Sequence, residues 1–232
     1  METFSRRKTV KKAFSASVPV MAGYIVLGIG FGILMNEKGY GILWTLAMSL
    51  FIYAGSLQYA GVSLITSSVS LVSAAITSLM GNARHLFYSI SMLEKYKDAG
   101  KFKPYMIFAL TDETYSLLSD GNVPEGCDPH FYRFMVSLFN QCWWIIGSGA
   151  GSLLGKALPF STEGIEFSMT ALFVASFAEQ WLSSENHFPS LAGLFSSVIC
   201  LILFGPNRFL IPSMILIILI LTIAHRMEEK RK

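Results

Sequence analysis

Long apolar runs separated by short polar stretches set the pattern of this chain. A helix that crosses the roughly 30 Å hydrocarbon core of a bilayer needs about 20 apolar residues. The pattern predicts eight candidate membrane segments, at residues 13–35, 42–66, 70–93, 104–118, 131–154, 165–182, 189–204 and 209–224. No soluble domain fits between them. We therefore predict an all-α integral membrane protein with about seven or eight transmembrane segments, forming a single membrane domain over residues 1–232.

Basic residues gather in three clusters, at residues 6–12, 95–103 and 226–232, and the chain as a whole is only 14% charged. A DNA-binding surface would combine such charge with side chains that read bases, whereas here the clusters border apolar runs. Short loops rich in Lys and Arg face the cytoplasm. We therefore predict a cytoplasmic N-terminus, an outer position for the acidic loop 119–130, and no role in binding nucleic acid.

A count of crossings points to a broken helix. Three full helices between Lys12 and Lys95 would leave the basic loop 95–103 outside, against its charge. One segment made of two half-helices, entering and leaving on the same side, restores the expected topology. The region 55–61 has the composition for such a break, and unwound backbone at membrane depth is tolerated only where protein or a cavity covers it.

Three short elements of the first half of the chain recur in the second half in the same order. They are 28–32 and 147–151, 50–59 and 172–181, and 81–84 and 205–208. Because the first half begins inside and the second begins at the predicted outer loop, we expect an inverted repeat over approximately 13–118 and 131–226. Inverted repeats with broken helices place a transporter's substrate site near the middle of the bilayer.

Ionisable residues inside a predicted span are costly and therefore suggest function. Asp112 and Glu113 could couple transport to protons or bind a substrate ammonium, since a buried unpaired carboxylate readily takes up a proton. The alternative is a structural ion pair with Arg84 or Arg208. Other polar residues inside predicted spans are Asn82, Arg84, His85, Asn140 and Gln141.

Gln58 and Gln180 occupy equivalent positions at the two predicted breaks. Their amides, together with backbone N–H groups of half-helices, could hold the polar end of a solute. Hydrogen bonding between helices is the alternative role. The substrate contacts that we predict are Phe51, Gly55, Ser56, Gln58, Phe173, Glu179 and Gln180.

Enzymatic motifs do not occur in the chain. The glycines of 28–32 lack the spacing of a dinucleotide fingerprint and favour close helix packing. No zinc-protease motif, nucleophile elbow or phosphate loop is present, and the three cysteines lack metal-binding spacing. We predict no enzymatic activity, no metal and no cofactor.

Several motifs together resemble the AzlC family of branched-chain amino acid permeases. They are Pro19 with Gly23-Tyr24 and the glycines of 28–32, the stretch 49–58, Asn82 to Ser89 with Arg84-His85, and Leu110-Thr111-Asp112-Glu113-Thr114. The resemblance covers about residues 13–224.

The resemblance implies an exporter of hydrophobic amino acids in the bacterial inner membrane, with a small hydrophobic AzlD-type membrane subunit as partner. Two alternatives remain open: a transporter or channel for another small metabolite, and a membrane scaffold subunit that transports nothing. The residues alone leave three kinds of energy coupling open: proton antiport, sodium coupling and simple facilitation.

Overall fold

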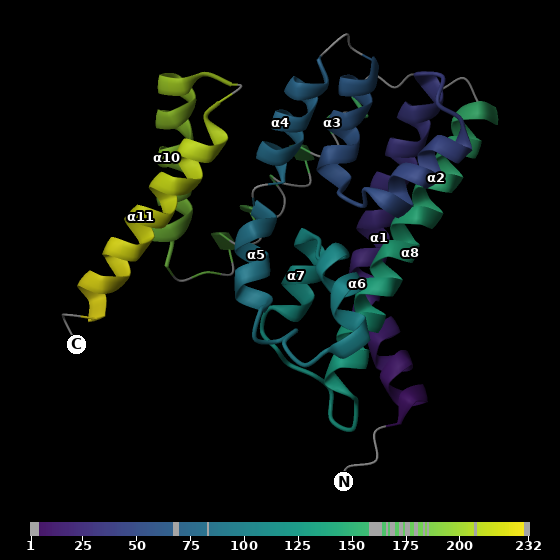
Figure 1. Cartoon of the computed structure of the whole chain (residues 1–232), viewed down its shortest axis with the longest axis horizontal. Helices are drawn as coiled ribbons and strands as arrows, with labels where there is room; N and C mark the ends of the chain where they lie inside the picture. Colours follow the sequence, from purple (N-terminus) through teal and green to yellow (C-terminus); the bar gives the residue numbers. More distant parts are fainter. Residues whose placement is uncertain are drawn as a thin grey trace. The chain divides into compact units, whose positions relative to one another are not determined.

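A computed structural model describes residues 5–66, 70–82, 84–157, 164–165, 167, 170–171, 174, 177–178, 181–182, 184, 186–206 and 208–229. Over these residues the chain is helical. The helices are α1 (Arg6–Glu37), α2 (Ile42–Phe51), α3 (Gly55–Thr66), α4 (Leu71–Gly81), α5 (Arg84–Met92), η1 (Gly100–Phe102), α6 (Lys103–Phe108), α7 (Asp112–Leu118), α8 (Pro129–Ala157), α10 (Phe188–Phe204) and α11 (Leu210–Glu229). Unit 1 comprises α1 to α3 and α5 to α8, and unit 2 comprises α4, α10 and α11 (Figure 1).

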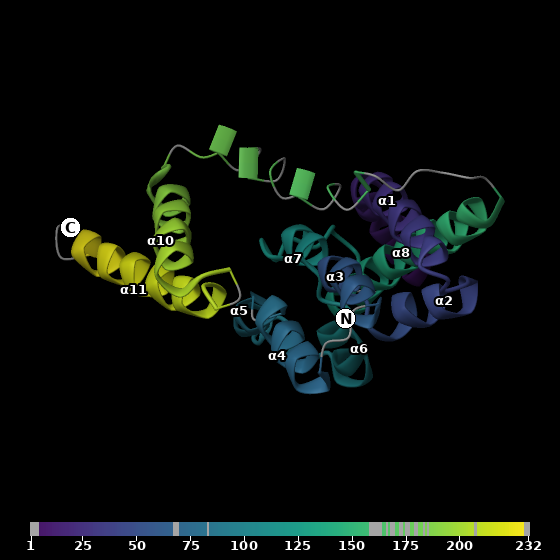
Figure 2. The ribbon, with the colours of Figure 1, turned by 90° about the horizontal axis from the view of Figure 1, so that it is seen from above.

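The two long helices α1 and α8 lie side by side in both views of unit 1 (Figure 2). Glycines make this closeness possible. A Cβ atom on Gly28 would lie 2.8 Å from the backbone nitrogen of Ser148, and one on Gly151 would clash with the carbonyl oxygen of Ile29. Small residues allow helix backbones to approach in this way. The predicted packing role of the glycines is confirmed, since the two glycine-rich segments face each other.

The direction of this pair differs from the prediction. Phe14 packs on Phe139 and Tyr24 on Trp144, with ring centroids 5.4 and 5.6 Å apart, and further along Gly32 meets Gly151. Because the residue numbers of the contacting pairs increase in the same direction along both helices, α1 and α8 are parallel. An inverted repeat requires them to run in opposite directions, so this pair contradicts the predicted inversion of the two halves.

Helices α2 and α3 form hairpin A, which starts where α1 ends. Helix α2 descends along α8, because Leu46 packs on Gly149 whereas the Leu50 carbonyl accepts a hydrogen bond from Gln141. Helix α3 returns along α1, where the Tyr59 hydroxyl donates to the carbonyl of Leu27 at 2.7 Å. The predicted broken segment is therefore confirmed.

The break in hairpin A lies slightly earlier than the sequence indicates. It occupies Ile52 to Ala54, and Gly55 is already the first residue of α3. Tyr53 adopts a φ of 41°, in the left-handed region that bulky residues rarely enter. Such strain persists only where the surroundings enforce it, often at functional positions.

Helices α6 and α7 form hairpin B, although the sequence predicted a single span over 104–118. Helix α6 ascends along α8, with Phe102 near Phe134 and Tyr105 bonded to Gln141. Helix α7 descends again, with Thr114 bonded to Asn140. The predicted span breaks because Thr111 starts a new helix: its hydroxyl accepts a hydrogen bond from the backbone N–H of Thr114, as an N-cap does.

Hairpin B changes the position of the acidic loop. The Lys95 ammonium donates to the carbonyl of Ser119, and the Lys8 side chain lies against Gly126. The acidic loop therefore shares one end of unit 1, here called the basic end, with the start of α1 and the loop after α5. The prediction that this loop lies on the opposite side from the N-terminus is wrong, because hairpin B returns to the end from which it enters instead of crossing.

The basic end is well packed. Met92 and Tyr96 are buried together with residues of α1, α6 and α8. The Arg133 guanidinium donates to the carbonyl of Lys95 at 3.2 Å. Burial raises the pKa of Tyr96 to about 12, with Arg133 opposing part of the rise, so this phenol stays neutral at physiological pH.

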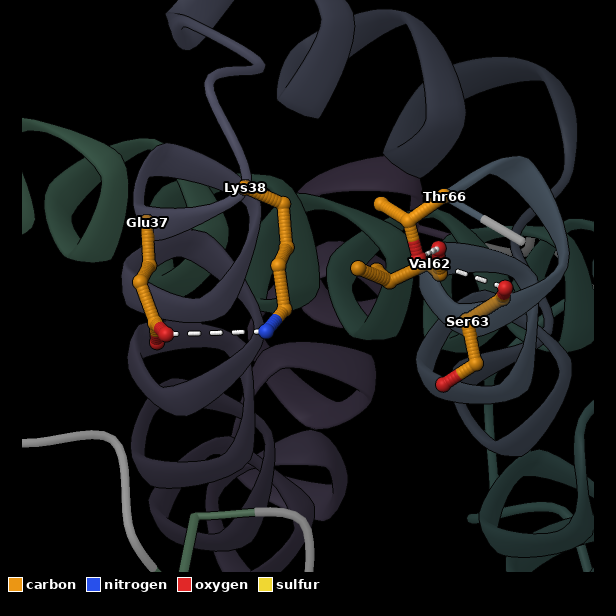
Figure 3. Close-up of polar contacts among 5 residues, drawn as sticks. All are labelled: Glu37, Lys38, Val62, Ser63 and Thr66. Atoms are coloured by element: carbon orange, nitrogen blue, oxygen red, sulfur yellow. Dashed lines mark hydrogen bonds and ion pairs between the residues drawn. The ribbon is translucent and has the colours of Figure 1, made fainter.

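The opposite, far end of unit 1 holds the C-terminal ends of α1 and α3 (Figure 3). An exposed ion pair joins Glu37 to Lys38 at 3.5 Å, and the Thr66 hydroxyl donates to the carbonyls of Val62 and Ser63. Hairpin A starts from this end. The two hairpins therefore enter unit 1 from opposite ends.

Unit 2 contains α10 and α11, which pack together around the buried residues Ser196, Cys200 and Ser213. Gly205, with a φ of 73°, ends α10. Within the part of the chain that the structure describes, α1 is the one helix both long and apolar enough to cross a bilayer by itself. The predicted span 165–182 falls largely outside this part, so the single domain and the repeat bounds stay predictions.

We predict that Gly32→Ala destabilises the protein, because the added methyl group would meet the backbone of Ser148 and Ser152. Overpacking of this kind costs about 1–3 kcal/mol. Thermal unfolding in detergent measures the effect. Gly23→Ala in the same helix is the matched control, since its Cβ would meet nothing within 4 Å. Equal melting temperatures for the two variants would contradict the close helix contact.

Candidate functional site

The tips of hairpins A and B meet beside α1. The Tyr24 hydroxyl of α1 donates to the carboxylate of Glu113 at 2.6 Å and lies 2.7 Å from the Thr111 hydroxyl. Both partners belong to the tip of hairpin B. Phe108 of the same tip lies near Tyr53 of hairpin A, with ring centroids 6.3 Å apart. Unwound backbone from opposite ends of unit 1 therefore converges in its centre.

A chain of hydroxyl and amide groups continues from Thr111 to α8. Thr111 donates to the Thr114 hydroxyl at 3.0 Å, which also accepts a hydrogen bond from the Asn140 amide at 3.0 Å. Thr114 and Asn140 are fully buried. Buried polar groups without partners are costly, so this network fixes the orientation of α7 on α8.

A second polar group surrounds the tip of hairpin A. The Ser49 hydroxyl lies 2.8 Å from that of Ser148 and accepts a weaker hydrogen bond from the Gln58 amide at 3.4 Å. All three side chains are fully buried. Gln58 thus forms the hydrogen bond between helices that was its alternative role, but only through its amide nitrogen.

Gln141 joins the two hairpins. Its amide nitrogen donates to the Leu50 carbonyl near the end of α2 at 3.0 Å, and its amide oxygen accepts a hydrogen bond from Tyr105 of α6 at 2.6 Å. A carbonyl in the last turn of a helix lacks an intrahelical partner. The side chain of α8 therefore satisfies backbone that the break in hairpin A exposes.

Tyr53 belongs to the same cluster. Its side chain is 3% exposed, and its hydroxyl interacts electrostatically with Glu113, Tyr24 and Thr111. Its left-handed backbone brings the side chain to this position instead of continuing α2.

Four buried polar atoms around the tips have no hydrogen-bond partner among the described residues. They are Tyr53 Oη, Gln58 Oε1, Asn140 Oδ1 and Trp144 Nε1. Most buried polar atoms in proteins are paired, so each such atom needs an explanation. Trp144 Nε1 can only donate, the two amide oxygens can only accept, and the Tyr53 hydroxyl can do either. Such a set suits a small solute that carries one positive and one negative charge.

Aromatic rings line the same region. Trp144 is 2% exposed and stacks on Phe31 with centroids 6.1 Å apart, and Phe31 packs on Tyr59 at 5.8 Å. The Trp144 ring also lies against Gly55, where a Cβ atom would be only 3.2 Å away. The first turn of α3 therefore faces an apolar wall.

The structure brings some of the predicted site residues together. Gly55, Gln58 and Glu113 lie at the two tips, and Ser56 and Asp112 lie in the first turns of α3 and α7. The Phe51 side chain is 74% exposed, so it does not belong to this buried cluster. The His85 ring packs on Tyr88, which in turn stacks on Tyr115 of α7 with centroids 4.6 Å apart.

Some predicted site residues lie outside the part of the chain that the structure describes. They are Phe173, Glu179, Gln180 and the side chain of Arg84. Asn82 belongs to unit 2 and is half-buried. No group of three or more side chains able to hold a metal ion occurs in the described part of the chain.

Sequence reasoning missed the aromatic members of the site. Tyr24 and Trp144 lie in long apolar helices, where an aromatic residue resembles any core residue. A signal for hairpin B was present, however. The span 104–118 is too short for a bilayer, and a threonine followed by two acidic residues is typical of a helix start.

Comparisons with known proteins place this architecture in a family. The chain is 41% identical over 95% of its length to the branched-chain amino acid transport protein AzlC of Bacillus subtilis, of which it covers 87%. It is 43% identical over 93% of its length to an uncharacterized membrane protein of Haemophilus influenzae, covering 88% of it. A membrane protein of Helicobacter pylori is 39% identical over 96% of the chain and is covered over 97%.

No solved structure matches the chain significantly. The model of the AzlC protein family matches residues 19–158, which include the glycine-rich contact and both hairpins. The family predicted from the motifs is confirmed, and with it the prediction that the chain is not an enzyme. The protein is a membrane protein of the AzlC family.

Proposed function

We propose that this protein transports branched-chain or other hydrophobic amino acids across the bacterial inner membrane, and that the substrate binds between the tips of hairpins A and B. The proposal rests on the convergence of the two tips beside Tyr24 and Glu113, with four unpaired polar atoms buried around the tips. The name of the Bacillus subtilis relative supports the substrate class.

The two charges of an amino acid fit different sides of this site. The ammonium group binds the Glu113 carboxylate, which Tyr24 holds in place through a 2.6 Å hydrogen bond. The carboxylate group binds at the first turn of α3, because a helix N-terminus presents backbone N–H groups and a partial positive charge. The indole N–H of Trp144 supplies a further donor.

The aliphatic side chain of the substrate packs against aromatic rings. Phe31, Tyr59 and Trp144 form a continuous buried wall behind the first turn of α3. Burying a leucine-sized side chain contributes about 1.5–3 kcal/mol, enough to favour leucine over alanine. The wall carries no charged group, so it rejects amino acids with charged side chains.

The substrate ammonium and a proton compete for Glu113. A carboxylate inside the membrane is costly unless its charge is neutralised, either by the substrate ammonium or by a proton. Release of one of these permits binding of the other. Export of the amino acid is thereby coupled to entry of a proton. A small hydrophobic AzlD-type subunit completes the transporter in the membrane, and the N-terminus lies in the cytoplasm.

We predict that Glu113→Gln raises the leucine concentration for half-maximal counterflow about tenfold. The glutamine keeps an acceptor but loses the charge, and a hydrogen bond to a charged group is stronger than a neutral one by about 1.5 kcal/mol. Counterflow of labelled leucine in proteoliposomes, with the small subunit co-expressed, measures the change. Glu37→Gln, an exposed position at the far end, is the matched control.

Two results would reject the proposed site. One is unchanged counterflow in both Gln58→Ala and Glu113→Gln, in protein that remains folded. The other is absence of leucine flux from the wild-type protein with and without the small subunit, which would favour another metabolite or a scaffold role.

We predict that a pH gradient alone drives leucine accumulation. In proteoliposomes with an acidic interior, protons leave and leucine enters, so labelled leucine accumulates above its outer concentration. Glu113→Gln abolishes this accumulation at saturating leucine while exchange continues, because the proton-binding group is lost. Accumulation that survives collapse of the pH gradient by an ionophore would contradict proton coupling but not the substrate site.

A further inference from the structure

A hollow of about 520 Å³ opens at the basic end of unit 1, away from the hairpin tips. It is lined by Arg6, Arg7, Val10, Lys11, Phe14 and Phe139. The surface that lines the hollow is almost entirely apolar, so Arg6, Arg7 and Lys11 contribute mainly their aliphatic stems beside the apolar side chains.

Helix geometry separates these residues from the rest of the basic cluster. Arg7, Lys11 and Phe14 are spaced by four and three residues, so they share one face of α1. Lys8 and Lys12 follow them by one residue and point about 100° away. Lys8 instead lies against Gly126 in the acidic loop.

Within residues 5–157 of unit 1 that the structure describes, no carboxylate pairs with the three cations of the hollow. Arg6, Arg7 and Lys11 are exposed and form no ion pair with any described residue. No carboxylate lines the hollow. Its positive charge therefore favours an anion from outside the chain.

Aromatic rings form the apolar part of the hollow. Phe14 packs edge-on against Phe139 and Trp143, yet remains 43% exposed. The Trp143 indole donates to Ser17 at 3.1 Å. Tryptophan is enriched at the boundary between hydrocarbon and headgroups, so we expect the basic side chains beside it at headgroup level.

We propose that this hollow binds one anionic phospholipid. The phosphate lies between Arg6, Arg7 and Lys11, and an acyl chain runs along Phe14 and Phe139. Basic residues at a membrane surface attract anionic lipids, and an aromatic surface beside them accommodates the chain. A free anion would use only the charged groups of these three residues and would leave the apolar lining of the hollow uncovered. This site is independent of the proposed substrate site.

Native mass spectrometry of the full-length protein in detergent tests the proposal. The protein is mixed with equal amounts of phosphatidylglycerol and phosphatidylcholine that carry the same acyl chains. We expect preferential retention of phosphatidylglycerol. The double variant Arg7→Gln/Lys11→Gln lowers its retention about 25-fold, since each basic residue near the surface contributes about a factor of five.

Matched variants distinguish the loss of this site from the loss of net positive charge. Lys8→Gln/Lys12→Gln removes the same charge from another face of α1 and leaves retention unchanged. The charge-conserving Arg7→Lys/Lys11→Arg retains the lipid, and equal melting temperatures without lipid confirm that all variants fold.

Three results would overturn the proposal. The first is equal retention of the two lipids, and the second is equal loss in both glutamine variants. The third is displacement of phosphatidylglycerol by an equal concentration of inorganic phosphate or glycerophosphoglycerol, which would identify a phosphate site. A dimer that dissociates only in Arg7→Gln/Lys11→Gln would identify a second copy of the chain as the occupant.

Discussion

The close contact between the α1 and α8 backbones supports the rest of unit 1. Lipid is as apolar as a leucine side chain, so helices in a membrane associate through tight packing instead of a hydrophobic effect. The glycines of 28–32 and 147–151 allow this packing between the two parallel helices. The resulting pair offers a continuous surface against which both hairpins lie, each entering from a different end.

The hairpins depend on this pair because their tips contain unwound backbone. Exposed N–H and C=O groups are not tolerated against lipid, so protein must cover them. Helix α8 supplies Gln141 for the end of α2 and Asn140, which donates to Thr114, for the first turn of α7. Helix α1 supplies Tyr24. The groups that make the breaks tolerable also concentrate polarity in the centre of unit 1, where a zwitterionic substrate needs it. Stability and substrate binding therefore draw on the same residues.

The sequence predicted hairpin A because Gly55, Ser56 and Gln58 interrupt an otherwise apolar run, which a simple span does not require. Hairpin B was not predicted, because the charge rule assumes that each apolar segment crosses the membrane, and the segment 104–118 does not. The predicted inversion of the two halves was wrong for the same reason, since it depended on the position of the acidic loop. Glu113 was identified by its charge alone. Tyr24 and Trp144 could not be identified, because their role arises from contacts with residues far away in the sequence, such as the Tyr24–Glu113 hydrogen bond across 89 positions.

Fluorescence of Trp144 tests most directly whether substrate binds between the hairpin tips. The chain has four tryptophans, so replacing the other three by phenylalanine leaves a reporter at the proposed site. In a variant that still transports leucine, binding between the tips predicts a saturable change in Trp144 emission at the leucine concentrations that support transport. A matched protein retaining only Trp44, which is 64% exposed, would show no change. An unchanged Trp144 spectrum in a transporting protein would contradict the account.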